Sequence, residues 1–281
     1  MINYYLITKP GIILGNLITV AAGFALGSKD GFNVWLFLAT LVGLTFIIAS
    51  ACVFNNYIDR SIDKKMHRTK NRPLVKGLIT GKNALLFGSV IGIIGFIILM
   101  TLTNLLTTAV AAFGFFVYVL LYSVWKSRTI FATAIGSISG ALPPVIGYCS
   151  ASGQFDAAAA ILFAMMVLWQ MPHFFAIALM HLDDYKKAGI PVLPIVKGIR
   201  QTKIHMTLYI LAFIPLNMML TFYHYTGYTY LVSTTAFALA WLILCLQGFN
   251  ITNYQQWGKQ MFRLSLAMIM VMCLVMPFDT L

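Results

Sequence analysis

The dominant feature of this sequence is a series of apolar runs, each long enough to cross a lipid bilayer. A helix of about 20 apolar residues covers the hydrocarbon core, so each run is a candidate membrane span. Hydrophobic residues make up 60% of the 281 residues and charged residues only 9%, which is more apolar surface than a soluble domain needs. We predict nine spans, at residues 10–27, 34–54, 84–103, 105–124, 130–150, 157–179, 204–223, 228–249 and 262–278.

The basic residues predict the orientation of these spans. If the amino terminus is cytoplasmic, every Lys and Arg except Lys29 falls on the cytoplasmic side, whereas Asp30, Asp156 and Asp279 fall on the far side. This asymmetry follows the positive-inside rule and predicts a multi-pass membrane protein with its amino terminus in the cytoplasm and its carboxyl terminus on the far side. The net charge of +12 therefore reflects topology, and we expect no nucleic-acid partner.

The four cysteines predict neither a disulfide framework nor a metal centre. Cys52, Cys149, Cys245 and Cys273 are scattered through apolar runs, and none forms a CxxC pair. Isolated cysteines of this kind behave as small buried hydrophobic residues. We expect residues 1–281 to form one integral-membrane domain, with long cytoplasmic loops at about 55–83 and 180–203.

The first long loop opens with a ladder of polar side chains in the segment NNYIDRSIDKKMHRTKNR, residues 55–72. Asn55 and Asn56 lie four and three positions before Asp59, and Asp63 lies four after it, so these side chains fall on one face if the helix continues beyond the membrane. Oxygen ligands followed by arginines suit a magnesium diphosphate, whose metal keeps phosphate oxygens as ligands. The alternative is a solvated basic loop anchored by positive-inside charge. The ladder is Asn55, Asn56, Asp59 and Asp63, and the bases beyond it are Lys64, Lys65, Arg68, Lys70 and Arg72.

The second long loop carries further candidates. Asp183 and Asp184 end the sixth predicted span, on the same face as the first ladder. His173 lies inside that span, and an ionisable residue within the membrane indicates function by default. His181 is better explained as a polar helix end at the interface.

Two shorter segments offer weaker signals. In LYSVWKSRT, residues 121–129, the spacing of Lys126 and Arg128 favours a short positive-inside turn. In GSISGALPPVIGY, residues 136–148, the glycines permit close helix packing and the two prolines predict a break in mid-membrane.

Together these motifs resemble a known family. NNYIDRSID followed by RTKNRPL resembles the first aspartate-rich motif of the UbiA superfamily of intramembrane prenyltransferases, with Asn56 in place of an aspartate. LYSVWKSRT is similar to its Y-x-x-x-K-x-x-T region, through Tyr122 and Lys126. The second aspartate-rich motif departs from the pattern because Asp183 and Asp184 are adjacent; Asp184 fits the pattern better, and the choice of ligand stays open.

Longer motifs narrow the resemblance to one branch of the superfamily, the enzymes that farnesylate protoheme IX (heme B). These motifs are KNRPLVKG, LPPVIGY, WQMPHF and DDYKKAGIPVLPIVKG, and the similarity extends from residue 8 to about residue 200. The resemblance implies an all-α bundle of nine helices around a central cavity, in the inner membrane of a bacterium. It also implies transfer of a farnesyl group from farnesyl diphosphate to a heme vinyl group, with water addition, giving heme O and diphosphate.

The resemblance also implies roles for individual residues. The diphosphate would be bound through Mg²⁺, one ion or two, and its growing charge would be neutralised by basic side chains. Besides farnesyl diphosphate, heme B and membrane lipid, the implied partners are a terminal oxidase or heme A synthase that receives the product. The implied magnesium ligands are Asn55, Asn56, Asp59, Asp63 and Asp184, the bases are Arg68, Arg72 and Lys126, and the heme contacts are Tyr122, Trp169 and His173.

Three alternatives remain open at the level of sequence. A sister prenyltransferase would act on an aromatic quinone precursor, and a heme-binding protein would release no diphosphate. A cation-coupled transporter would place its acidic site at mid-membrane on broken helices. Here the acids lie at the membrane edge, beside bases that would repel a cation.

Overall fold

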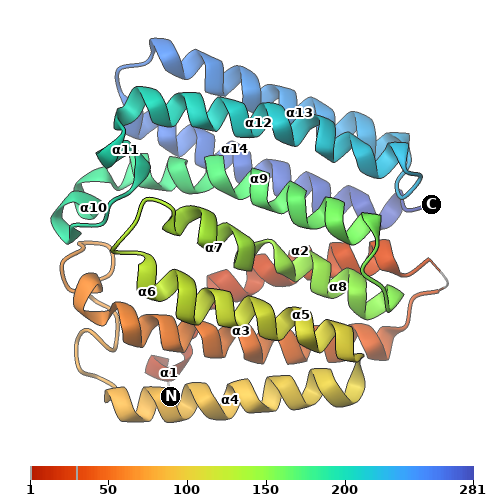
Figure 1. Ribbon diagram of the computed structural model, residues 1–281, viewed down its shortest axis with the longest axis horizontal. Coiled ribbons are helices and arrows are strands. Elements are labelled where there is room, and N and C mark those ends of the chain that lie inside the picture. The colour runs from red at the N-terminus through yellow and green to blue at the C-terminus, as the bar shows by residue number, and fades with distance from the viewer. Residues whose placement is uncertain (1, 30) are drawn as a thin grey trace.

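The computed structural model describes residues 2–29 and 31–281, and their regular structure is helical, as predicted. Asp30, one of the predicted far-side acids, lies outside the described residues. Long helices lie side by side, with their connections gathered at two opposite ends (Figure 1). The helices are α1 (Ile2–Ile7), α2 (Pro10–Gly27), α3 (Val34–Asp63), α4 (Gly81–Leu102), α5 (Leu105–Phe116), the π-helix η1 (Val117–Tyr122), α6 (Ser123–Trp125), α7 (Ala132–Gly140), α8 (Leu142–Ser152), α9 (Ala157–Met180), α10 (Leu182–Ala188), α11 (Leu193–Val196), α12 (Gly198–Phe222), α13 (Tyr228–Gln247), η2 (Gly248–Asn250), α14 (Tyr254–Val275) and η3 (Met276–Phe278).

Eight helical segments within the described residues are long and apolar enough to span a membrane. They match eight of the predicted spans, although α12 and α14 begin earlier than predicted because their first turns are polar. The remaining predicted span, 130–150, is divided into α7 and α8 at Ala141. Pro143 and Pro144 lack the N–H groups that would continue the helical ladder, so the predicted break is confirmed.

The outward faces of the helices are apolar, which is the reverse of a soluble bundle. On α4, Leu86, Ile93 and Met100 are each about 60% exposed. The opposite face of α4 carries glycines, and Gly95 lies so close to α3 that an added Cβ would meet the Gly43 carbonyl oxygen at 2.8 Å. Small residues inside and large apolar residues outside are typical of helices that pack within lipid.

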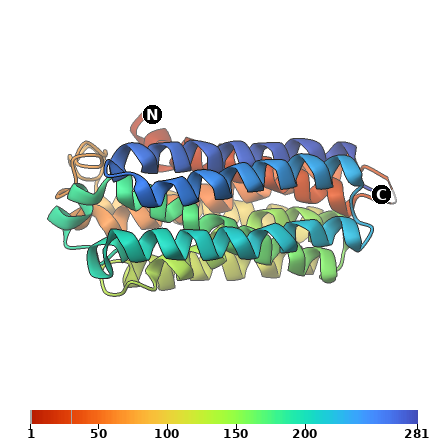
Figure 2. The ribbon, with the colours of Figure 1, turned by 90° about the horizontal axis from the view of Figure 1, so that it is seen from above.

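Two glycines bring α2 and α8 into close contact. A Cβ at Gly23 would overlap the Pro144 carbonyl group, and a Cβ at Gly147 would overlap the Val20 carbonyl group. The broken pair α7–α8 is therefore held against α2 in the interior of the bundle, and α8 is almost wholly buried. Seen from above, the long helices run alongside one another in more than one layer (Figure 2).

We expect Gly23→Ala to destabilise the protein by about 1–3 kcal/mol, because the new methyl group must push α2 away from α8. Gly15→Ala is the matched control, since it lies on the same helix with nothing within 4 Å of its added Cβ. Thermal unfolding of both variants in detergent, followed by circular dichroism, measures the difference. Equal stability of the two variants would contradict the close packing.

Candidate functional site

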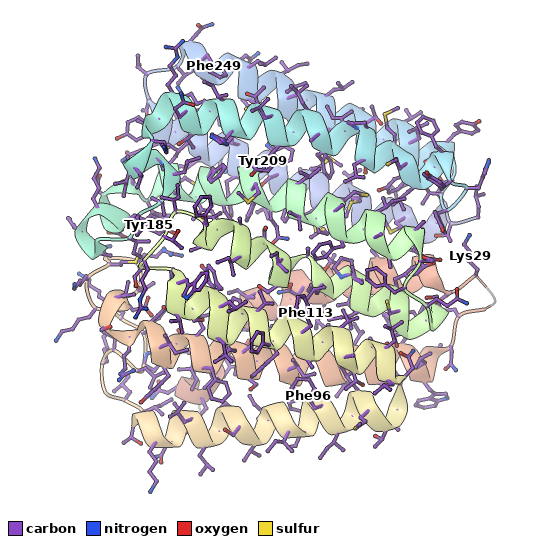
Figure 3. All side chains as sticks on the ribbon, viewed as in Figure 1. Lys29, Phe96, Phe113, Tyr185, Tyr209 and Phe249 are labelled. Carbon is purple, nitrogen blue, oxygen red and sulfur yellow. The ribbon has the colours of Figure 1, made fainter. Side chains whose placement is uncertain are left out.

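The two long loops meet at one end of the bundle. The carboxylate of Asp184, on α10, accepts hydrogen bonds from the backbone N–H groups of His67 and Arg68, both at 3.2 Å. Met66 is buried against Ala188 and Ile190 beneath these bonds. Tyr185 marks this end in Figure 3, and Lys29 marks the opposite end. The prediction that both loops lie on the same face is therefore confirmed.

The polar ladder lies on one continuous helix, as predicted, because α3 extends to Asp63. Asp59 is fully buried, and its Oδ2 accepts hydrogen bonds from Lys126 Nζ at 2.7 Å and from Asn55 Nδ2 at 3.1 Å. Its other oxygen, Oδ1, is buried with no hydrogen-bond partner among the described residues. A buried carboxylate oxygen without a partner is costly, and it marks a place where a further ligand would be stabilised.

Asn55 connects this carboxylate to two other elements. Its Oδ1 accepts a hydrogen bond from Lys9 Nζ at 2.5 Å, and its Nδ2 also donates to Ser123 Oγ at 2.9 Å. Lys9 adopts a left-handed backbone conformation, with φ of 55°, between α1 and α2. Such a conformation is unfavourable for a lysine, and it aims the ammonium group at the polar cluster.

A π-helical segment delivers the partners of Asn55 and Asp59. Ser123 begins α6 directly after η1, and its hydroxyl donates to the carbonyl oxygen of Tyr118, within η1, at 2.9 Å. The wider turn also stacks Tyr118 on Tyr122, with ring centroids 5.5 Å apart. Single π-helical turns within longer helices often occur at functional sites. The family resemblance implied a role for Lys126, but no residue pattern indicated the π-helical turn.

Asp63 and Asn56 face other partners. Asp63 is buried and forms an ion pair with Arg72, at 2.5 Å. The Asn56 amide nitrogen donates to the Ile7 carbonyl oxygen at 2.7 Å, which anchors α1 to α3. Asn56 Oδ1, like Asp59 Oδ1, is buried without a partner in the described part of the chain.

A cavity of about 520 Å³ opens beside this cluster. Its volume lies within the range typical of small-molecule sites. Basic and polar side chains line one part, while apolar side chains of α3, α5 and α8 line another. The polar lining includes Lys9, Asn55, Arg68, Arg72, Tyr122 and Lys126, and the apolar lining includes Leu44, Ile47, Ile48, Phe115, Leu142 and Ile146.

The surroundings of three charged side chains at the loop end of the cavity shift their pKa values. Burial lowers the pKa of Lys9 to about 8. Burial also opposes the charge of Lys126, but Tyr122 and Asp59 outweigh it and raise the Lys126 pKa above its ordinary value. For Asp184, the backbone hydrogen bonds from Arg68 and His67 outweigh desolvation and lower its pKa. Lys126 and Asp184 are therefore charged at neutral pH.

The wall formed by α9 and α14 carries two of the three predicted heme contacts, Trp169 and His173. Trp169 Nε1 donates to the Ser265 carbonyl oxygen at 2.9 Å, and His173 Nδ1 lies 2.7 Å from Ser265 Oγ. The His173 ring stacks on Trp169 at 4.8 Å and faces Phe262 at 4.9 Å, measured between ring centroids. The helix is continuous through Pro172, so this proline does not end α9.

The two glycines of α7 receive side chains from neighbouring helices. A Cβ at Gly136 would meet the Tyr122 ring at 2.9 Å, and a Cβ at Gly140 would overlap the Gln170 amide. Gln170 Nε2 donates to the Ser137 carbonyl oxygen at 3.2 Å, near the break between α7 and α8. The sequence pattern identified these glycines as a packing motif, but it could not identify Tyr122 and Gln170 as their partners.

The structure brings together many of the predicted site residues but not all of them. The carboxylates of Asp59, Asp63 and Asp184 do not line the cavity, and no three His, Cys, Asp or Glu side chains of the described residues gather into a metal cage. Asp183 is exposed. The predicted residues that do line the cavity are Asn55, Arg68, Arg72, Tyr122, Lys126, Trp169 and His173. The magnesium ligand set therefore stays a prediction.

Four polar residues of this site, Lys9, Ser123, Gln170 and Ser265, were not among the predicted site residues. Lys9 was used only to orient the chain, although its charge and its place before a helix-starting proline were visible. Ser123, Gln170 and Ser265 gave no signal, because their hydrogen-bond partners are distant in sequence.

Eight apolar helices of membrane-spanning length around a cavity with a basic mouth define an integral, multi-pass membrane protein with a site suited to an anionic ligand. The fold is shared with solved structures of digeranylgeranylglyceryl phosphate synthase (TM-score 0.82, 18% identity, covering 99% of this chain and 97% of that one) and of a UbiA homolog from Archaeoglobus fulgidus bound to GPP and Mg²⁺ (TM-score 0.71, 16% identity, covering 95% and 99%). The model of the UbiA prenyltransferase family matches residues 16–267, and the chain belongs to that family.

Curated relatives match over the whole chain. A protoheme IX farnesyltransferase of Protochlamydia amoebophila (strain UWE25) is 57% identical over 280 residues, covering 99% of each chain. A protoheme IX farnesyltransferase of Yersinia pseudotuberculosis serotype O:1b (strain IP 31758) is 51% identical, covering 99% of this chain and 95% of its own. The family resemblance predicted from the motifs is confirmed.

We expect Lys126→Met to destabilise the protein by about 3–5 kcal/mol, because it leaves the buried Asp59 carboxylate without its cation. The double variant Asp59→Asn with Lys126→Met removes both charges and should recover much of that loss. Thermal unfolding in detergent tests both statements. A single variant as stable as the wild type would show that the ion pair contributes nothing.

Proposed function

We propose that this protein transfers the farnesyl group of farnesyl diphosphate to a vinyl group of protoheme IX, with addition of water, giving heme O and diphosphate. The observation that carries the proposal is the cavity of about 520 Å³, which joins a basic mouth to an apolar interior and to the His173 wall. Full-length relatives named protoheme IX farnesyltransferase, 57% and 51% identical, support the choice of donor and acceptor.

The basic mouth suits the diphosphate leaving group. In the proposed reaction, the allylic C–O bond breaks and its electron pair leaves with the diphosphate. Arg68, Arg72 and Lys126 line the cavity where this negative charge would grow, and Lys9 adds a fourth cation. Placing fixed positive charge where negative charge develops is usually the largest catalytic effect in such a site.

The apolar interior of the cavity suits the farnesyl chain of the donor. The farnesyl cation would lie among the side chains of α3, α5 and α8, where little water can intercept it. The vinyl π electrons of the heme then form the new C–C bond, and the resulting cation on the heme side chain takes a water oxygen and loses a proton. Exclusion of bulk water from the first step protects the reactive cation.

The residues beside the mouth fit a magnesium ion. The buried Asp59 Oδ1 has no partner in the described part of the chain, and carboxylate oxygen is a preferred ligand of Mg²⁺. An incomplete protein cage suits this ion, since Mg²⁺ keeps waters and substrate phosphate oxygens. When bound, it would neutralise charge on the leaving diphosphate. The residues that would hold it are Asn55, Asp59 and Asp63, with Asn56 and Asp184 as further candidates.

The residues proposed to contact the heme acceptor lie on α9 and at the end of η1. Trp169 and His173 line the cavity together with Tyr122, and all three are candidate contacts of the heme. Imidazole is a common axial ligand of heme iron. We propose that the His173 ring contacts the iron of the heme substrate.

We also propose how the chain is oriented in the membrane. We count α7 and α8 together as a ninth crossing, so the two termini would lie on opposite faces; in Figure 1, α1 lies in the left half of the bundle and the carboxyl terminus at its right end. The loop end would face the cytoplasm of a bacterial cell, with residues 1–281 acting as one domain. The product would then pass to a terminal oxidase or heme A synthase.

The function is tested with the purified full-length protein in detergent, supplied with heme B, farnesyl diphosphate and magnesium. We expect heme O in the chromatographic separation of pigments, and release of one diphosphate for each heme O. Asp59→Ala should form no heme O although it still inserts in the membrane. Consumption of farnesyl diphosphate only with an aromatic quinone precursor, or no consumption at all, would overturn the proposal.

We expect Arg68→Gln to raise the KM for farnesyl diphosphate by roughly tenfold or more, since a hydrogen bond to a charged group contributes about 1.5–3 kcal/mol. Lys70→Gln is the matched control, because it removes the same charge from the same loop at an exposed position outside the cavity. Initial rates at varied farnesyl diphosphate measure both. An equal rise in the two variants would mean that only the general positive field matters.

A further inference from the structure

Ser265 of α14 holds the His173 side chain through a contact that no sequence motif indicated. Ser265 is fully buried, and its hydroxyl lies 2.7 Å from His173 Nδ1. The same hydroxyl donates to the Phe262 carbonyl oxygen at 2.7 Å, one turn earlier in α14. A serine hydroxyl has one hydrogen. If that hydrogen goes to Phe262, Ser265 Oγ can only accept from His173, and Nδ1 must carry the ring proton.

The surroundings of the ring favour the same assignment. In the alternative tautomer, Nε2 would carry the proton and would need an acceptor on the cavity side. Of the described residues that line the cavity, none is an aspartate, and the sequence contains no glutamate. The hydrogen bond of the ring within the described part of the chain is made by Nδ1, so a lone pair at Nε2 is free to bind a ligand in the cavity.

The ring is also fixed in orientation. Trp169 and Phe262 face the imidazole ring at interplanar angles of 22° and 32°, so rotation about its side-chain bonds would displace one of them. Trp169 is itself fastened, because its Nε1 donates to the backbone carbonyl oxygen of Ser265. Ser265 therefore holds both Trp169 and His173 in the wall formed by α9 and α14.

We infer that Ser265 is a positioning residue that keeps His173 in its Nδ1-protonated form and aims the Nε2 lone pair into the cavity, toward the iron of the heme acceptor. The inference rests on the proposed function for the identity of the acceptor. A hydrogen bond from the second ring nitrogen is the usual way in which a protein orients a histidine ligand of a metal and raises its basicity.

The tautomer can be measured on the unaltered protein. The ¹⁵N chemical shifts of the ring nitrogens distinguish the two tautomers, and His173→Ala identifies the signal of this residue among the five histidines. We expect a neutral ring protonated at Nδ1. Protonation at Nε2 would overturn the inference, whatever the activity of the enzyme.

The effect on the acceptor is measured by titrating heme B into the full chain and recording its visible spectrum. We expect Ser265→Ala to weaken heme binding roughly threefold to tenfold, as for loss of one neutral hydrogen bond, and to shift the Soret band. Ser265→Thr keeps the hydroxyl and should restore both. His205→Ala is the control, because His205 lies outside the cavity.

A double-mutant comparison separates positioning from general structure. In a His173→Ala background, Ser265→Ala should change heme binding no further, because its effect acts through the imidazole. A further loss of similar size would overturn the inference. If wild-type protein forms heme O while Ser265→Ala binds heme normally, the inference fails and the proposed function stands. If wild-type protein forms no heme O, the proposed function fails, and the ¹⁵N result still decides the tautomer.

Discussion

The structure depends on one buried polar network at the loop end of α3. Asp59 is fully buried in a bundle surrounded by apolar surface, where an unpaired charge would cost several kcal/mol. Lys126 and Asn55 share its Oδ2, and Asn55 also binds Lys9 and Ser123. These bonds connect α3 to the start of α2 and to the end of the α5–α6 segment. Helices that enclose the cavity are therefore connected through the buried Asp59 carboxylate.

The cavity owes its shape to irregular helices. The π-helical turn η1 brings Ser123 and Lys126 to the network, and the break at Ala141 allows α8 to lie against α2. Glycines at the contacts admit carbonyl groups and side chains where a Cβ would collide. Irregular backbone within a membrane is tolerated only where protein surrounds it or a cavity accepts its polar groups, and both conditions hold here.

The division of the cavity corresponds to the chemistry proposed for it. Cations at the mouth suit the diphosphate, apolar side chains suit the prenyl chain, and the wall of α9 and α14 suits a flat acceptor. Asp184 connects the loops over the mouth through two backbone amides. The acids predicted as magnesium ligands lie outside the cavity lining. Oxygen atoms of the bound diphosphate would therefore have to supply the remaining magnesium ligands.

The sequence alone determined the membrane location, the helical class, the polar ladder of α3 and the family, because apolar run length and motif spacing are local properties of the chain. It also predicted the break at Pro143 and Pro144, since a missing N–H has a local consequence. Only the tertiary structure decided that Asn56 turns to α1, that Lys9 reaches Asn55, and that Ser265 holds His173. These contacts join residues 46 or more positions apart, and their partners are chosen by packing rather than by spacing.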